Sequence, residues 1–87
     1  MNSTEFAKTM ATNLRLLRGI YNYTQQEVSE RLYISRSCYS DIEAEASELS
    51  FFCAYQLGEL YGLSLDALAS PDLFKRVVAT IRENPEK

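Results

Sequence analysis

The chain has 87 residues, a length that suffices for one modest core but not for a second domain. Its formal net charge is −3, and its 46% hydrophobic and 24% charged residues are typical of a folded chain. It contains no histidine and only two cysteines, Cys38 and Cys53, which are too far apart for a short-spaced zinc cluster, so we expect no enzyme, no metal and no other cofactor. No stretch approaches the roughly 20 apolar residues of a membrane span and the N-terminus does not resemble a signal peptide, so we expect no membrane partner and a cytoplasmic protein with reduced thiols.

The first predicted helix runs from Thr4 to Arg18. Its apolar residues recur at intervals of four, four and three positions, the spacing of one buried helix face: Phe6, Met10, Leu14 and Leu17. Gly19 is the expected stop, because glycine commonly follows the last turn of a helix.

A second helix is predicted to begin directly after this stop. Residues 24–27 read Thr-Gln-Gln-Glu, the form of a capping box, in which the threonine hydroxyl and the glutamate carboxylate each bond a backbone N–H group. Val28 and Leu32 give this helix an inner face. Ser35 is the expected N-cap of the next helix, so only a short turn separates the two.

The third predicted helix covers residues 36–43. Tyr39 and Ile42 are three positions apart, so both can face the core. The opposite side is the surface that a partner would meet, and it presents polar and small residues: Ser37, Ser40, Asp41 and Ala44.

A fourth helix is predicted between Ser50, its N-cap, and Gly62, its C-terminal stop. Its candidate core positions are Phe51, Ala54, Tyr55, Leu57 and Tyr61. The next helix is short, with Ser64 as its cap and with Leu65 and Leu68 expected to point inward.

The sixth predicted helix opens at residues 70–72, which read Ser-Pro-Asp, with a cap, a proline and an acid in their preferred places. Because no strand pattern appears, the fold class is all-α, a compact bundle of five to six short helices. We divide the chain into a domain at 1–70 and a C-terminal helix with a frayed end at 71–87.

This C-terminal helix carries two adjacent apolar rows, which together are wide enough for more than one docking surface. The stripe either packs on its own domain or pairs with a second copy of the chain, and the sequence leaves both readings open. In the second case the homodimer face consists of Phe74, Val77, Val78 and Ile81.

Two short helices joined by a tight turn, with a fourth helix after them, make residues 13–68 resemble the lambda-repressor/Cro-like helix-turn-helix family. The phrases that carry the resemblance are Leu17-Arg18, Thr24 to Leu32, Ile34 to Ser37, Ile42-Glu43 and Tyr61 to Asp66. The resemblance implies a sequence-specific transcriptional regulator that binds double-stranded DNA as a homodimer, with the third helix in the major groove.

The resemblance also implies which residues meet the DNA. Thr24 and Gln25, at the start of the second helix, would bond phosphates. The N-terminal end of the third helix would meet base edges, with Arg36 as the main basic contact. The other residues on that face are Ser37, Ser40 and Asp41.

Family members often pair the arginine that ends the first helix with the glutamate that ends the third, which are Arg18 and Glu43 in this chain. Such a pair fixes the angle between two helices more than it adds net stability. A phosphate contact is the competing role for Arg18.

Three features depart from the family pattern. Glycine and basic or amide residues often follow the third helix, but residues 44–48 read Ala-Glu-Ala-Ser-Glu, and Asp41 lies close by. Tyr33 stands where a turn glycine is common. A left-handed backbone there would cost about 1 kcal/mol, whereas a slightly different turn would avoid this conformation. The negative net charge also opposes DNA binding. An alternative function is therefore an interaction module, like an antitoxin or a phage-type accessory protein, whose acidic 41–48 surface binds a basic protein partner.

Overall fold

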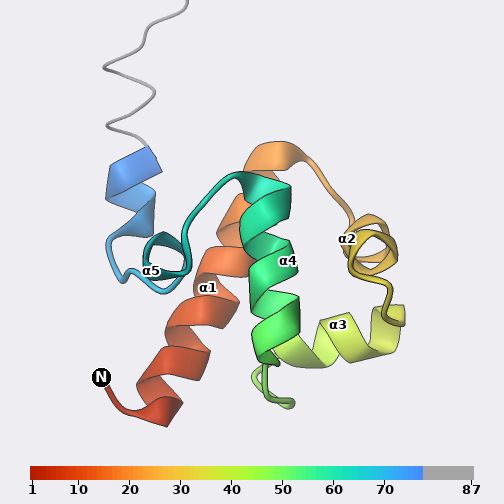
Figure 1. Cartoon of the computed structure of the whole chain (residues 1–87), viewed down its shortest axis with the longest axis horizontal. Coiled ribbons are helices and arrows are strands. Elements are labelled where there is room, and N and C mark those ends of the chain that lie inside the picture. Colours follow the sequence, from red (N-terminus) through yellow and green to blue (C-terminus); the bar gives the residue numbers. More distant parts are fainter. Residues whose placement is uncertain (78–87) are drawn as a thin grey trace, which may run out of the picture.

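The computed structural model describes residues 1–77 of the chain. In this part it has five helices, followed by a helical segment at 73–77. The helices are α1 (Ser3–Tyr21), α2 (Gln25–Leu32), α3 (Arg36–Glu43), α4 (Phe51–Tyr61) and α5 (Leu65–Leu68), as Figure 1 shows. No strand occurs among residues 1–77, so the prediction of an all-α bundle is confirmed over the described part of the chain.

The two short helices α2 and α3 pack against each other and form the helix-turn-helix unit. The α3 helix also contacts α1, and α4 contacts both α2 and α5. In Figure 1, α2 and α3 lie at one end of the molecule, and α5 with the segment 73–77 lies at the other. The unit therefore packs against α1 and α4 on its inner side, and no helix within the described residues covers the outer side of α3.

The core takes one face from each helix. Its buried members are Met10, Leu14, Leu17, Val28, Leu32, Tyr39, Ile42, Leu57, Tyr61, Leu68 and Leu73. The inner faces predicted for the first three helices are confirmed, except that Phe6 is only half-buried against this core. Burial of these side chains is the main favourable contribution to folding.

Side-chain caps set the starts of the helices. The Thr24 hydroxyl accepts a hydrogen bond from the Glu27 amide at 3.0 Å, and the Thr24 amide donates to the Glu27 carboxylate at 2.8 Å, so the predicted capping box is confirmed. Ser35, Ser50 and Ser64 likewise accept bonds from amides three residues further along. The helix starts expected at these four residues are therefore all present.

The end of α1 differs from the predicted end at Arg18. The helix passes through Gly19 and ends at Tyr21, and Asn22 has the left-handed backbone conformation that was expected of a glycine, with φ 59°. The Asn22 amide donates to the carbonyl oxygens of Arg18 and Gly19. Asparagine tolerates this conformation well, so the chain did not need Gly19 to stop the helix.

Three apolar residues named as candidate core positions are instead exposed. Phe51 and Tyr55 lie on the outer side of α4, whereas Ala54 and Leu57 on the same helix are buried. Leu65 is also exposed, because α5 is a single turn that buries only Leu68. These side chains leave apolar surface in contact with water.

The turn between α2 and α3 contains a non-glycine residue in the left-handed region. Tyr33 has φ 60° and ψ 39°, and 87% of its surface is exposed. The predicted alternative, a different turn that avoids this conformation, does not occur. A tyrosine here costs stability and contributes almost no packing in return.

We therefore expect Tyr33→Gly to raise the free energy of unfolding by roughly 0.5–1 kcal/mol, since glycine removes the left-handed penalty at a smaller entropic cost. Thermal unfolding followed by circular dichroism measures the effect as a higher Tm. Tyr33→Ala is the matched control, because alanine also removes the ring but keeps the Cβ atom that causes the penalty. Equal melting temperatures for the two variants would contradict this explanation.

Candidate functional site

The candidate site lies on the outer side of α3. The helix is seated by its buried residues Tyr39 and Ile42, which turn the opposite side to solvent. On that side Arg36, Ser37 and Asp41 are exposed, as the sequence predicts, whereas Ser40 is half-buried. The polar surface expected to meet a partner is thus present and accessible.

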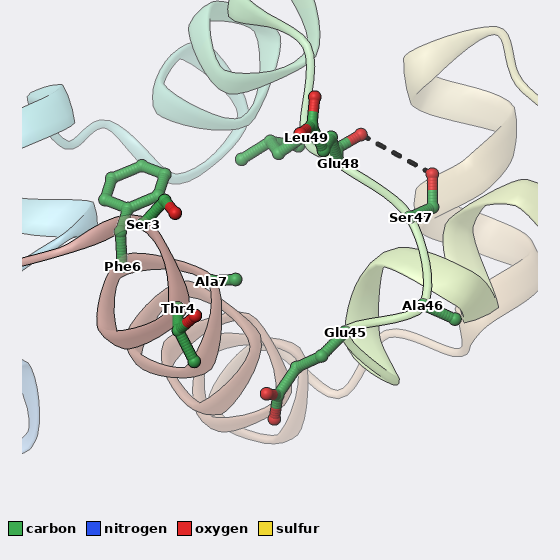
Figure 2. Close-up of a pocket in the computed structure, with 9 residues that line it drawn as sticks. All are labelled: Ser3, Thr4, Phe6, Ala7, Glu45, Ala46, Ser47, Glu48 and Leu49. Carbon is green, nitrogen blue, oxygen red and sulfur yellow. Dashed lines mark hydrogen bonds between the residues drawn. The ribbon is translucent and has the colours of Figure 1, made fainter.

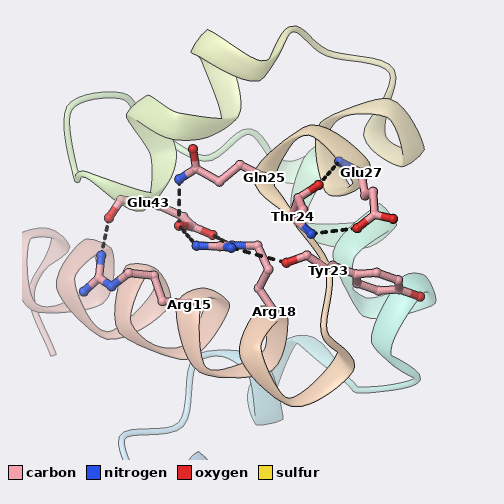
Figure 3. A network of polar contacts seen from close by, with 7 residues as sticks. All are labelled: Arg15, Arg18, Tyr23, Thr24, Gln25, Glu27 and Glu43. Atoms are coloured by element: carbon pink, nitrogen blue, oxygen red, sulfur yellow. Dashed lines mark hydrogen bonds and ion pairs between the residues drawn. The ribbon is translucent and has the colours of Figure 1, made fainter.

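The start of α2 brings two more predicted residues to this side, and both already have partners. The Thr24 hydroxyl and amide are used in the capping box. The Gln25 side-chain amide donates to Glu43 Oε1 at 3.0 Å, so it links the first residue of α2 to the last residue of α3 (Figure 3). No pattern in the sequence predicts this bond.

Glu43 is the centre of a polar network that joins three helices. Arg18 donates to it twice, from Nε to Oε2 at 2.8 Å and from Nη2 to Oε1 at 3.1 Å (Figure 3). Arg18 also donates to the Tyr23 carbonyl oxygen at 3.3 Å, and Arg15 donates to the Glu43 carbonyl oxygen. The two residues of the expected ion pair therefore lie together, with Glu43 only 3% exposed.

The charges of this network are fixed at neutral pH. Burial alone would raise the pKa of Glu43, but hydrogen bonds from Arg18 and Gln25 outweigh it and hold that pKa below its ordinary value. The hydrogen bond to Glu43 in turn raises the pKa of Arg18. Because its guanidinium is already engaged by Glu43 and Tyr23, Arg18 suits the role of a structural link better than that of a phosphate contact.

Two aromatic hydroxyl groups lie buried close to this network. Burial raises the pKa of Tyr61 to about 12 and also raises the pKa of Tyr39. The Tyr61 hydroxyl has no hydrogen-bond partner within the described residues, and the Tyr39 hydroxyl lies near the Glu43 carboxylate, which further raises the pKa of Tyr39. Both rings are therefore neutral parts of the core.

Arg36 differs from the neighbouring arginines in that it is free. It has no hydrogen-bond or ion-pair partner among residues 1–77, whereas Arg15 and Arg18 bond Glu43 and Arg31 lies over the Tyr23 ring at 4.7 Å. An arginine in this state can bond guanine O6 and N7 or a phosphate without first breaking an internal contact. It is the basic group best placed to act at the outer side of α3.

The acidic loop is the segment 44–49, which follows α3. Glu45 and Glu48 are exposed, and Glu45 has a left-handed backbone with φ 63°. Together with Asp41 they put three carboxylates beside the outer side of α3, as the sequence predicts. These carboxylates repel a phosphate backbone at close range.

A cavity of about 430 Å³ separates this loop from the N-terminal part of α1. Figure 2 shows Phe6 and Ala7 of α1 on one side and Leu49 with Glu48 on the other. The Ser47 hydroxyl bonds the Glu48 carbonyl oxygen at 3.5 Å. The cavity therefore offers an apolar wall beside acidic groups.

The candidate homodimer face on the C-terminal helix is only partly described. Phe74 is 59% exposed, whereas Val77 is half-buried against the core. Val78 and Ile81 lie outside the described residues. The proposed face therefore keeps one well-exposed apolar side chain in this part of the chain.

Among residues 1–77, no cluster of three or more histidine, cysteine, aspartate or glutamate residues could hold a metal ion. Cys38 and Cys53 are free thiols. None of the helices in the described range is long and apolar enough to cross a membrane.

Comparison with protein families matches residues 11–71, which is more than half of the chain, to a family described as a helix-turn-helix domain. Comparisons with curated proteins and with solved structures find no significant match.

Proposed function

Because the chain belongs to this family of helix-turn-helix domains, we propose that it is a sequence-specific DNA-binding regulator that acts as a homodimer, with the N-terminal half of α3 in the major groove. In this proposal the protein binds double-stranded DNA and catalyses no reaction. It acts in the cytoplasm. The observation that carries the proposal is the uncovered polar side of α3 with the unpartnered Arg36 at its first turn.

The side chains of α3 suit base readout. Arg36 can take guanine O6 and N7 together, and Ser37 and Ser40 can serve either a donor or an acceptor edge. Asp41 can accept from cytosine N4, which gives this carboxylate a use in the groove despite its charge. Specificity would then come from a few short contacts on one helix face.

The start of α2 suits phosphate binding. The Thr24 amide is used in the capping box, but the backbone N–H group of Gln25 and the positive end of the α2 helix dipole favour an anion. The bond from Gln25 to Glu43 holds this helix end in a fixed position relative to α3. We propose that a phosphate binds there and sets the register of α3 in the groove.

Few cations support this binding, so one copy should bind weakly. A homodimer on two half-sites would turn weak contacts into a usable affinity. We propose this homodimer together with a division of the chain into two parts. These are a helix-turn-helix domain at 1–70, which binds DNA, and an added helix at 71–87.

The test is a salt titration of binding to random-sequence duplex DNA, measured by fluorescence anisotropy. We expect binding that weakens steeply with salt, and Arg36→Ala combined with Gln25→Ala should weaken it by at least about tenfold. Circular dichroism verifies that the variant is folded. Lys8→Ala is the matched control, since it removes an exposed and unpartnered cation of α1. Equal losses in the two variants would refute the proposed face.

A second candidate function is that of an interaction module for a basic protein. The cavity beside Glu45 and Glu48, with its apolar wall from Phe6, favours it. A basic peptide could place an apolar side chain in the cavity and its cations on the loop. This candidate predicts no detectable binding to DNA even at low salt.

A further inference from the structure

The α4 aromatic face, which we define as Phe51, Phe52 and Tyr55 with Leu65 of α5, leaves large apolar side chains exposed to solvent. Phe51 is 80% exposed, Phe52 is 66% exposed and Tyr55 is 58% exposed. Monomeric proteins seldom leave several large aromatic side chains in contact with water, and such patches mark binding surfaces.

This face also contains a hollow of about 250 Å³. The small residues Ala54 and Gly58 line it together with Phe51, Tyr55 and Leu65. A cavity of about 150 Å³ is enough to hold a benzene molecule, so this hollow can receive one aromatic ring.

The position of the hollow depends on Gly58. A Cβ atom at this residue would lie 2.7 Å from the Leu63 carbonyl oxygen, closer than real side chains allow. Glycine therefore lets the segment 63–65 approach α4 and brings Leu65 beside Tyr55. The hollow is therefore a consequence of close backbone packing between α4 and the segment 63–65.

We propose that the α4 aromatic face binds a second copy of the chain across a two-fold axis, with Phe51 of each copy in the hollow of the other. A two-fold interface must be self-complementary, because the same patch is used on both copies. This face meets that condition, since the exposed ring and a hollow of matching size lie in one patch. Glu59 is the only charged residue that lines the hollow, so apolar contacts and not ion pairs would hold the two copies together.

The size of the face predicts a weak contact. With about 150–250 Å² for each aromatic side chain and the exposures given above, the three rings offer roughly 400 Å² per copy. A stable interface buries about 800 Å² per partner. Two copies should therefore associate reversibly at high concentration and pair fully when DNA holds them together.

The biological meaning of this contact rests on the proposed function, but the contact itself does not require DNA. The contact is therefore tested by sedimentation equilibrium of the full chain without DNA, at protein concentrations from about 5 to about 500 μM. The wild-type chain is expected to form a concentration-dependent dimer, and Phe51→Glu should weaken its association at least tenfold.

Phe74→Glu is the matched control, because it makes the same change at an exposed phenylalanine of the competing face. It is expected to leave association unchanged. A wild-type chain that stays monomeric throughout would overturn the inference, and so would a dimer that Phe74→Glu disrupts and Phe51→Glu does not. If circular dichroism shows that Phe51→Glu does not fold, Tyr55→Glu takes its place, and it is likewise expected to weaken association. A monomer that still binds random DNA would overturn this inference alone.

Discussion

Glu43→Gln is expected to lower the free energy of unfolding by about 3 kcal/mol, the low end of the range for breaking a buried ion pair. The low end applies because the Arg18 side chain is 25% exposed and water partly compensates for its lost partner. The new amide would also bring a donor group to a place where Arg18 and Gln25 already direct donors. Urea unfolding followed by circular dichroism measures this loss.

A double-mutant cycle separates the ion pair from simple loss of packing. Arg18→Met with Glu43→Met removes both charges, so neither is left buried alone. The double variant should therefore be less destabilised than the sum of the two single variants. Additive effects would show that Arg18 and Glu43 do not depend on each other.

The same pair makes stability depend on pH in a defined direction. The pKa of Glu43 is lower in the folded chain than its ordinary value of about 4.5, so protonation favours unfolding. The stabilisation is fully present above that ordinary value and is lost as the pH falls through the lower value of the folded chain. Glu43→Gln should show a flatter decrease in stability over this acid range than the wild-type chain.

The helix-turn-helix unit was predictable because its signals are local. The capping box at residues 24–27 and the serine caps at Ser35 and Ser50 each act within three residues, so the starts of α2, α3 and α4 can be read from the chain. The end of α1 was missed because two residues near it could adopt the required backbone. Local preference alone does not choose between Gly19 and Asn22.

The contacts between helices were harder to predict from the sequence than the helix starts. The bond from Gln25 to Glu43 joins residues eighteen positions apart, and no periodic pattern signals it. The sequence places Phe51 and Tyr55 one turn apart, which is also the spacing of a buried row, so periodicity could not tell the exposed side of α4 from the buried one. The signal that could have separated them is the second row, Ala54, Leu57 and Tyr61, which already completes an inner face.

Charge reversal in the acidic loop is expected to strengthen DNA binding if α3 enters the major groove. Glu45→Lys with Glu48→Lys replaces two repelling carboxylates by two cations and changes the formal net charge from −3 to +1, since each reversal adds two units. The affinity for random-sequence duplex at low salt should rise at least about tenfold, and its salt dependence should steepen by up to about two units of slope.

Asp66→Lys with Asp72→Lys is the matched control, because it makes the same change in net charge at exposed residues near α5, at the other end of the molecule from α3 (Figure 1). This control should gain much less affinity, since Coulomb interactions are screened beyond about 10 Å at ordinary salt. Equal gains would mean that only the net charge matters and that the loop does not face DNA. A larger gain for the loop variant would instead mean that its carboxylates limit the affinity of the native protein, which would then depend on Arg36 and on pairing of two copies.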